Sequence, residues 1–446
     1  MNKANKQKTV IRNILLATPF IVALFTNALS LEANDLVGKV ILTMVVGAWF
    51  MLASWMKLRS IKSVFENIYV IYGLMFFAYA IIGCTVFILD NMTPRFYYFR
   101  ITQSSLAETI TLYINILCIY AIVCFITNTI KPLAINIKEQ KNRYNINNKA
   151  IIFFSILALI ASALNIYNVV SSGSFLALST SAKRGIINNE FSHYINLFIL
   201  SYSLLIVYIS IINKKAPRLV VIIPILLFWA TVLTCERRMF VTLLIGIALI
   251  AILSVKKIRL KYGILAVIVA LALLSIGAIR DNITLKNHSF NDVLYSSTTE
   301  FYCTFMISNA YIVDEHELQY GKTYALDTIT KALPREIYKN KPEDLSVQFM
   351  NEYKTNVGFA YNPVAEGLLN FGKASQLIVP IIMIAICKFA VSLSKRNPIY
   401  YATVYMFALD FFRGAFSNMA FDIAFCCIII ACLLYAAKNK GERNDN

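Results

Sequence analysis

Long apolar runs alternate with short polar connectors along most of the chain. Each run is about 17 to 24 residues long, and a helix needs ~20 residues to cross the ~30 Å hydrocarbon core of a bilayer. Because lipid offers the backbone no hydrogen-bond partner, runs of this kind are expected to be helices. The pattern predicts about twelve membrane spans, at residues 12–30, 36–56, 67–90, 108–130, 149–170, 193–213, 218–234, 239–255, 262–279, 376–393, 398–416 and 418–437.

The composition agrees with a membrane protein, since 58% of the 446 residues are hydrophobic and only 15% are charged. Soluble domains are far more polar. One long polar stretch interrupts the apolar runs and divides the chain into three parts. Residues 1–279 contain nine spans, residues 280–375 form a large insert, and residues 376–446 contain three spans and a tail. We therefore predict an all-α polytopic membrane protein with one large extracytoplasmic loop.

Basic residues gather in connectors that fall on one side of the membrane if the spans simply alternate. The net charge of +18 therefore follows membrane topology and does not indicate a nucleic-acid partner. By the positive-inside rule this side is the cytoplasm, so both termini are cytoplasmic and the 280–375 insert lies outside. The basic connectors are residues 57–66, 131–148, 214–218, 256–261 and 394–397.

Metal-ligand spacing is absent from the sequence, and neither a metal site nor a cofactor is expected. The nine cysteines lie mostly within apolar runs, and their positions match neither a zinc site nor a disulfide framework. The three histidines are scattered. His193 begins a predicted span at its outer end and is expected to be an interfacial residue.

The insert is too long to be a plain connector, and it carries helix signals of its own. In its first half, Phe301, Phe305 and Ile312 have the spacing of a helix that packs against the membrane domain. The insert is therefore expected to be folded onto the spans that support it.

Capping residues predict two shorter helices in the second half of the insert. Asp344 is a suitable N-cap for a helix at residues 345–353. Asn362 would cap a second helix, Pro363 would be its first residue, and Gly372 would end it.

Cations recur at the outer ends of the predicted spans and in the insert, where membrane topology disfavours them. Any single one can be explained by a neighbouring acid, such as Asp410 three residues before Arg413, or by snorkelling to the interface. Their recurrence in five outer segments indicates an anionic ligand. A diphosphate suits them, because the planar fork of arginine binds phosphate oxygens in pairs. The cations are Lys183, Arg184, Arg237, Arg238, Arg280, Arg335 and Arg413.

Two motifs in the insert resemble the O-antigen polymerase (Wzy-type) family. They are Leu333-Pro-Arg335 and the run from Gly358 to Gly372, which reads GFAYNPVAEGLLNFG. The Arg-Gly pair at Arg413, in the penultimate predicted span, is similar to that family too. The number of spans and the large outer loop late in the chain extend the resemblance to the whole topology. The sequence shows no nucleotide-binding GxxxxGK[ST] or GxGxxG loop, so a lipid-borne donor is expected.

The resemblance implies a metal-independent glycosyltransferase with a GT-C-like fold in the bacterial cytoplasmic membrane. Such an enzyme would transfer a growing glycan from undecaprenyl diphosphate to an incoming lipid-linked repeat unit at the outer face. This is the polymerisation step of O-antigen or related surface polysaccharide synthesis. Its partners would be undecaprenyl-diphosphate-linked oligosaccharides and membrane lipid, and a chain-length regulator is a further candidate partner.

The reaction assigns roles to the charged residues. Without a divalent metal, arginines must neutralise the charge that develops on the departing lipid diphosphate, and Arg335 and Arg413 are the first candidates. The other outer cations would bind the diphosphate. Glu366 is the candidate general base for the acceptor hydroxyl, with Glu336 and Glu300 in reserve. The simpler explanation for Glu366 is a first-turn carboxylate that the helix dipole favours.

Aromatic residues are too common in this chain to mark a sugar site by themselves. Most of the 25 tyrosines and 30 phenylalanines are expected in the membrane-interface belts or in the core. Tyr302, Tyr338 and Tyr361, which lie in the insert, are the candidates for contact with sugars.

Two other functions remain open on the sequence alone. An O-antigen ligase has a similar build, and the sequence separates it poorly from a polymerase. A flippase or transporter of a lipid-linked glycan would carry charges at mid-membrane depth, broken helices and an internal repeat. Here the charges gather at the outer ends and no repeat is visible, which favours an enzyme.

Overall fold

Every regular element in the described part of the chain is a helix, as the sequence predicts. The computed structural model describes residues 3–29, 35–89, 101–133, 135, 137, 148–171, 190–213, 218–235, 237–255, 290–314, 316–333, 337–355 and 359–437. These residues divide between two compact units. The first comprises residues 1–133, 258–389 and 408–421, and the second comprises residues 134–257, 390–407 and 422–446.

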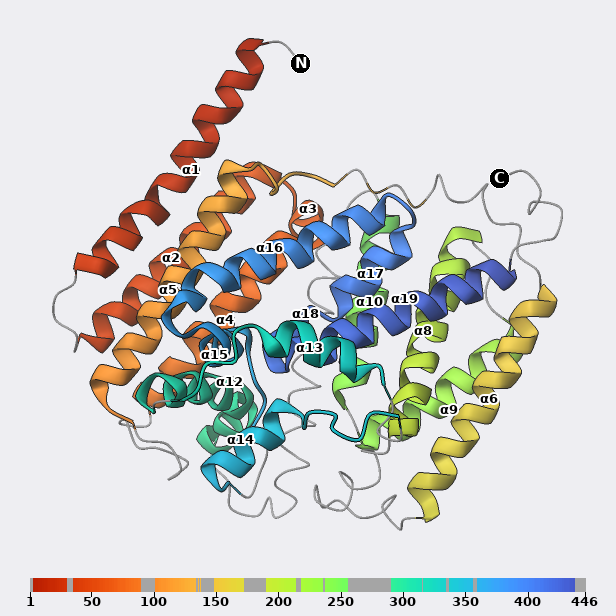
Figure 1. Ribbon diagram of the computed structural model, residues 1–446. Coiled ribbons are helices and arrows are strands. Elements are labelled where there is room, and N and C mark those ends of the chain that lie inside the picture. The colour runs from red at the N-terminus through yellow and green to blue at the C-terminus, as the bar shows by residue number, and fades with distance from the viewer. Residues whose placement is uncertain are drawn as a thin grey trace. The chain divides into compact units, whose positions relative to one another are not determined.

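The first unit is built around a packed group of long apolar helices (Figure 1). They are α1 (Lys3–Leu29), α2 (Leu36–Leu58), the short α3 (Ile61–Glu66), α4 (Ile68–Leu89) and α5 (Gln103–Ile126). Phe20 stacks on Phe125 with ring centroids 5.8 Å apart. A Cβ on Gly73 would lie 2.4 Å from the Phe50 ring, so α2 and α4 can approach this closely only with glycine there.

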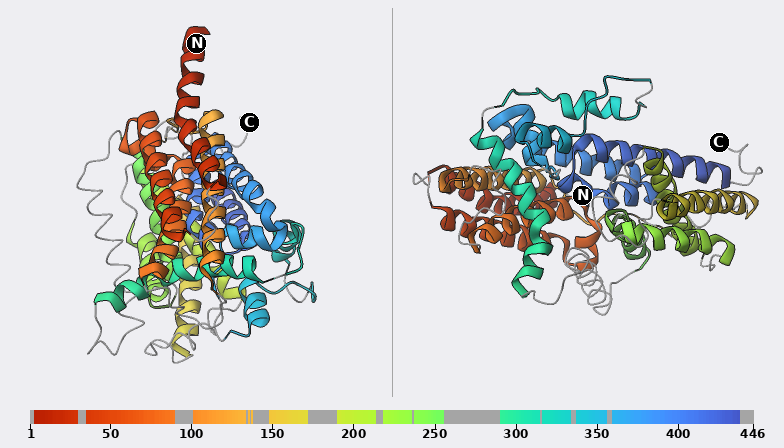
Figure 2. Two further views of the ribbon diagram at one scale, coloured as in Figure 1. Left: turned by 90° about the vertical axis from the view of Figure 1, so that its left-hand side faces the viewer. Right: turned by 90° about the horizontal axis from the view of Figure 1, so that it is seen from below.

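The helices of the insert pack onto this group. They are α12 (Phe290–Val313), α13 (Lys322–Lys331), α14 (Leu345–Tyr353) and α15 (Pro363–Phe371), and a short 3₁₀ turn (Gly372–Ala374) joins α15 to α16 (Ser375–Ser394). Figure 2 shows α12 lying across the ends of α4 and α5. The Phe301 ring lies 4.6 Å from that of Tyr79, and Phe305 is fully buried. The predicted helix that packs against the membrane domain is therefore confirmed.

Asn362 fixes the start of α15, as predicted from its capping potential. Its Oδ1 accepts hydrogen bonds of 2.8 Å from the N–H groups of both Val364 and Ala365. Its amide nitrogen donates to the Tyr113 hydroxyl at 2.8 Å and to the Thr304 carbonyl at 2.6 Å. The buried Asn362 side chain thus satisfies N–H groups in the first turn of α15 and links that helix to α5 and α12.

The predicted helix at residues 345–353 is confirmed as α14, but its N-cap behaves differently from the prediction. Asp344 occupies the N-cap position without a capping hydrogen bond from its side chain. Its carboxylate instead pairs with the Lys331 ammonium at 2.6 Å, and this pair ties the start of α14 to the end of α13.

The predicted span at residues 398–416 is not one continuous helix. α17 (Pro398–Met406) ends at Phe407, α18 (Ala408–Arg413) follows, and α19 (Phe416–Ala437) begins after a short break. α18 and the first turn of α19 belong to the first unit.

The second unit contains α6 (Asn148–Ser171), α8 (Glu190–Asn213), α9 (Leu219–Cys235), α10 (Arg237–Ser254), α17 and the rest of α19. Buried polar pairs link its helices. The Tyr208 hydroxyl donates to Asn397 Oδ1 at 2.7 Å, and the Trp229 indole N–H donates to Ser203 at 3.1 Å. Such pairs satisfy polar groups that lipid would leave without partners.

Seven described helical segments are long and apolar enough to cross a membrane. The class predicted from the sequence is thus supported, but the count of twelve is not confirmed. The predicted span at 262–279 lies outside the described residues. The seven segments are Gln7–Ala28, Leu36–Leu58, Ile68–Thr85, Gln103–Ile126, His193–Ile212, Pro363–Ser394 and Phe416–Ala436.

Candidate functional site

Glu366 joins three helices of the first unit. Its side chain is almost fully buried, with 1% of the residue exposed. Oε1 accepts a hydrogen bond of 2.7 Å from the Thr323 hydroxyl on α13, and Oε2 accepts one of 2.7 Å from the Phe416 N–H at the start of α19. The carboxylate therefore satisfies an otherwise unpaired N–H at a helix N-terminus, where the helix dipole favours negative charge.

Asn370 extends this arrangement along α15. Its amide nitrogen donates to the Thr323 hydroxyl at 2.7 Å, and its Oδ1 accepts from the Gly321 N–H at 3.0 Å. The backbone N–H of Gln319 donates to the Leu369 carbonyl at 3.1 Å. The segment before α13 is thus held along the end of α15 by both side-chain and backbone bonds.

The amphipathic pattern of α13 is inverted. Its buried face carries the polar residues Thr323, Asp327 and Thr330. Its exposed face carries apolar residues, and Leu326 is 46% exposed and Ile329 is 70% exposed. A surface helix of a soluble protein shows the opposite arrangement. α13 therefore turns its polar face toward α15 and the start of α19.

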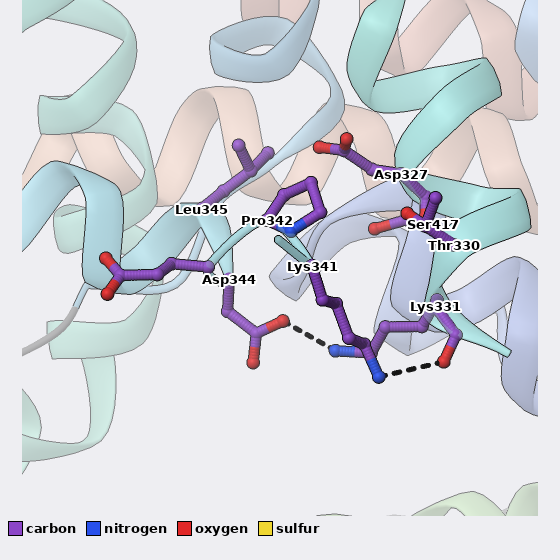
Figure 3. Close-up of a pocket in the computed structure, with 9 residues that line it drawn as sticks. Asp327, Thr330, Lys331, Lys341, Pro342, Asp344, Leu345 and Ser417 are labelled. Carbon is purple, nitrogen blue, oxygen red and sulfur yellow. Dashed lines mark hydrogen bonds and ion pairs between the residues drawn. The ribbon is translucent and has the colours of Figure 1, made fainter. Parts of the chain in front are cut away.

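Beside this polar face lies a small hollow that is open to solvent (Figure 3). Lys341 is largely buried, and its ammonium donates to the carbonyls of Lys331 at 3.1 Å and Leu333 at 2.9 Å. It thereby satisfies carbonyls at the C-terminal end of α13. The pocket is lined by Asp327, Thr330, Lys331, Lys341, Pro342, Glu343, Asp344, Leu345 and Ser417.

Asp327 is the most unusual residue of this pocket. It is only 9% exposed, and its Oδ1 has no hydrogen-bond partner within the described structure. Burial raises the pKa of its carboxyl group above the ordinary value, and the nearby cations of Lys322 and Lys331 partly offset this rise.

The aromatic residues of the insert form a core of their own. The hydroxyls of Tyr311 and Tyr361 are hydrogen-bonded to each other, and the Phe349 ring packs on both, with centroid distances of 6.0 and 6.2 Å. Burial and the neighbouring Tyr311 raise the pKa of Tyr361, so its hydroxyl stays neutral. Of the sugar-contact candidates, Tyr302 and Tyr361 are buried, whereas Tyr338 is half-buried.

Arg413 lies in the last turn of α18 with a half-exposed side chain. It precedes Phe416 by three residues, and Phe416 donates the backbone hydrogen bond to Glu366. The fold thus brings the segment that carries Arg413 to the insert helix that carries Glu366, although the two residues are far apart in sequence.

The other predicted cations and carboxylates lie in the second unit or outside the described residues. Arg238 is half-buried and belongs to the second unit. The remaining candidates, or their side chains, lie outside the described residues: Lys183, Arg184, Arg237, Arg280, Glu300, Arg335 and Glu336.

The second unit contains a His–Asp pair. His193 Nε2 lies 2.8 Å from Asp422 Oδ1, and the side chains are 37% and 3% exposed respectively. The partial exposure of His193 is compatible with the expected interfacial position. The described residues contain no group of three or more His, Cys, Asp or Glu residues that could hold a metal ion.

Sequence reasoning missed Thr323, Asp327 and Asn370. The residues Thr323, Asp327 and Thr330 follow a helical spacing, and this signal was available in the sequence. However, a polar helical face ordinarily predicts a solvent-facing surface, so the pattern alone did not indicate a site.

The described residues form helices only, and seven helical segments among them are long and apolar enough to cross a membrane. The family model described as O-antigen polysaccharide polymerase Wzy matches residues 10–440. The chain belongs to this family, as the motifs in the insert predict. Comparison with curated proteins and with solved structures gave no significant match.

Replacing Glu366 by Gln should destabilise the protein. Glutamine has one acceptor oxygen and would turn an NH₂ group toward one of two donors, which leaves a buried group unpaired at a cost of about 1–3 kcal/mol. Thermal unfolding of the full chain in nanodiscs would measure this change. The matched control is Glu317→Gln at an exposed position of the insert, which should change the unfolding free energy by less than about 0.5 kcal/mol. Unchanged unfolding of Glu366→Gln would contradict the role of Glu366 as a structural tie.

Proposed function

We propose that the protein polymerises a surface polysaccharide such as O-antigen at the outer face of the bacterial cytoplasmic membrane. It would transfer a growing glycan from undecaprenyl diphosphate to an incoming lipid-linked repeat unit. The observation that supports this most strongly is the family match over nearly the whole chain. The folded insert against the apolar helices is the kind of scaffold that such a reaction needs.

The transfer exchanges one bond to the sugar for another. The acceptor hydroxyl oxygen attacks the anomeric carbon of the donor glycan, and the bond from that carbon to the phosphate oxygen breaks. The acceptor proton goes to a base, and the departing undecaprenyl diphosphate gains negative charge. We propose that Arg413 and Arg335 neutralise this charge without a metal ion, because guanidinium groups stay ionised and bind phosphate oxygens in pairs.

For Glu366 we propose a positioning role. A general base must come within hydrogen-bond reach of the proton that it removes. In this structure both carboxylate oxygens of Glu366 are occupied by protein donors, and the side chain is shielded from solvent. The geometry thus favours Glu366 as the residue that holds α13, α15 and the start of α19 in place around the reaction.

We further propose that both termini face the cytoplasm and that the insert faces the opposite side. The basic connectors support this orientation. Within the first unit, the N-terminal end of α1 and the short α3 lie at one end, while α12 and α14 lie toward the other (Figure 1).

Deletion of the gene in its host should leave surface glycans that are only one repeat unit long. Polymerisation would be lost while export and attachment continue, so electrophoresis of the surface glycan should show a single short band instead of a ladder. Re-expression of the chain should restore the ladder. Complete loss of surface glycan would instead favour the flippase or the ligase.

Arg413→Ala should abolish the ladder at normal protein abundance, and Arg413→Lys should restore it only partly, because lysine cannot form the paired contacts of a guanidinium. Arg335→Ala should behave like Arg413→Ala. The control is Arg396→Ala, which removes an exposed arginine from the connector between α16 and α17. A wild-type ladder from Arg413→Ala would remove Arg413 from the site.

The orientation can be tested by cysteine labelling in intact cells. Asn340→Cys, at an exposed position in the insert, should react with a membrane-impermeant maleimide added from outside. Lys395→Cys, at an exposed position in a basic connector, should react only after permeabilisation. The unsubstituted chain measures the background from native cysteines. The opposite labelling pattern would invert the proposed topology.

A further inference from the structure

We propose that the apolar face of α13 lies in the bilayer, at the boundary between the hydrocarbon core and the headgroups. This helix would then anchor the insert to the leaflet on its own side, and the partner of the face is a lipid surface. The exposed residues that form the face are called the α13 stripe; they are Ala325, Leu326, Ile329, Ala332 and Leu333. The inference goes beyond the proposed function, since it holds whether or not the protein polymerises a glycan.

The stripe follows the period of a helix. Leu326 and Ile329 are three residues apart, which places them on one face of α13, and Leu333 continues the spacing just after the helix. Their exposed fractions are 46%, 70% and 38% respectively. The stripe contains only apolar residues, whereas the outer face of a helix in water is polar.

α14 shows the ordinary pattern within the same insert. Its exposed positions are Asn351 and Glu352, whereas its apolar residues Leu345 and Phe349 are buried. The exposed sides of α13 and α14 are therefore suited to different surroundings. For a chain that spans a membrane, these surroundings are lipid and water.

The contacts of Tyr324 place α13 at the start of two long apolar helices. Its ring stacks on Phe371 with centroids 5.9 Å apart and packs against Phe416 at 5.2 Å. α16 begins four residues after Phe371, and α19 begins at Phe416. These helices contain 20 and 22 residues, the length that crosses the hydrocarbon core. α13 therefore lies at the depth at which α16 and α19 would enter the membrane.

The direction of α13 agrees with a helix in the membrane plane. It runs crosswise to the long helices of the first unit, such as α5 (Figures 1 and 2). A helix that lies in this plane buries its apolar side ~5–10 Å into the boundary between headgroups and acyl chains. The exposed side of α13 has the composition that such burial requires.

The residues at the start of α13 are typical of a membrane interface. Tyr320, which directly precedes the N-cap residue Gly321, is 82% exposed, and Lys322 in the first turn is exposed as well. Tyrosine rings are enriched at the headgroup level, and a lysine can extend its ammonium from the apolar boundary into water. Both residues can therefore remain in contact with the headgroups while the stripe lies deeper.

The hydroxyl groups of α13 need no water. Thr323 donates to Glu366 at 2.7 Å, Thr328 to the Tyr324 carbonyl at 2.9 Å, and Thr330 to the Leu326 carbonyl at 2.9 Å. Lipid offers no partner to a polar group, so a helix can enter it only if such donors are satisfied within the protein. Contact between lipid and the stripe would leave these three donors paired.

Fluorescence quenching from lipid and from water tests the proposal. Ile329→Cys is labelled with bimane in the full chain, which is reconstituted in phosphatidylcholine nanodiscs at a single chain per disc. Phosphatidylcholine with a nitroxide near the headgroup end of its acyl chain should lower the fluorescence about twofold or more, because an interfacial helix lies at this depth. Aqueous iodide should have little effect. The unsubstituted chain measures the label on native cysteines.

The matched control is Asn351→Cys, at an exposed position of α14 in the same insert. Iodide should quench its label, and the nitroxide lipid should not. Leu326→Cys gives a second measurement on the stripe and replaces Ile329→Cys if that variant does not fold.

Three results would overturn the proposal. Quenching of the Ile329→Cys label by iodide and not by the nitroxide lipid would show that the stripe faces water. Quenching by neither would show that protein covers it. Equal quenching by the lipid at Ile329→Cys and Asn351→Cys would show that contact with lipid is not specific to the stripe.

The measurement needs no glycan, so its outcome is separate from that of the proposed function. If the nitroxide lipid quenches the label at Ile329→Cys but lipid-linked units are never elongated, polymerisation fails and the lipid contact stands. If iodide quenches that label in a chain that elongates the glycan, polymerisation stands and the lipid contact fails.

Discussion

The arrangement of the insert depends on one buried carboxylate. Glu366 receives a hydroxyl proton from α13 and a backbone N–H from the start of α19, and no solvent competes for either bond. In such surroundings the hydrogen bonds are stronger than in water, and an unmade bond is correspondingly costly. The carboxylate thereby couples the insert to the start of α19. Its position within α15 is fixed in turn by Asn362, which anchors that helix to α5 and α12.

The elements that the sequence could predict are those with strong local signals. α14 and α15 were found because Asp344, Asn362, Pro363 and Gly372 mark their ends, and these signals act over a few residues. Asp344 is the N-cap residue, as predicted, but its carboxylate pairs with a long-range partner, Lys331, and makes no capping hydrogen bond. Such competition depends on tertiary structure and is invisible in a short window of sequence.

α13, in contrast, is a helix that local sequence signals did not predict. Its N-cap residue is Gly321, in the left-handed region at φ 85°, and no side-chain cap marks its start. Its polar residue Thr323 is buried against Glu366 and Asn370, which reverses the usual meaning of an amphipathic pattern. The contacts of Glu366 could not be predicted for the same reason. Glu366 was recognised as important from its motif, but its contacts come from residues about 40 to 50 positions away in the sequence.

The reversed faces of α13 have a practical consequence for the insert as an isolated fragment. Excision would remove Phe416, which belongs to another part of the chain and donates to Glu366, while the side chains of Leu326 and Ile329 would stay as exposed as they are in the full chain. The structure and ligands of the insert are best studied in the full chain surrounded by lipid.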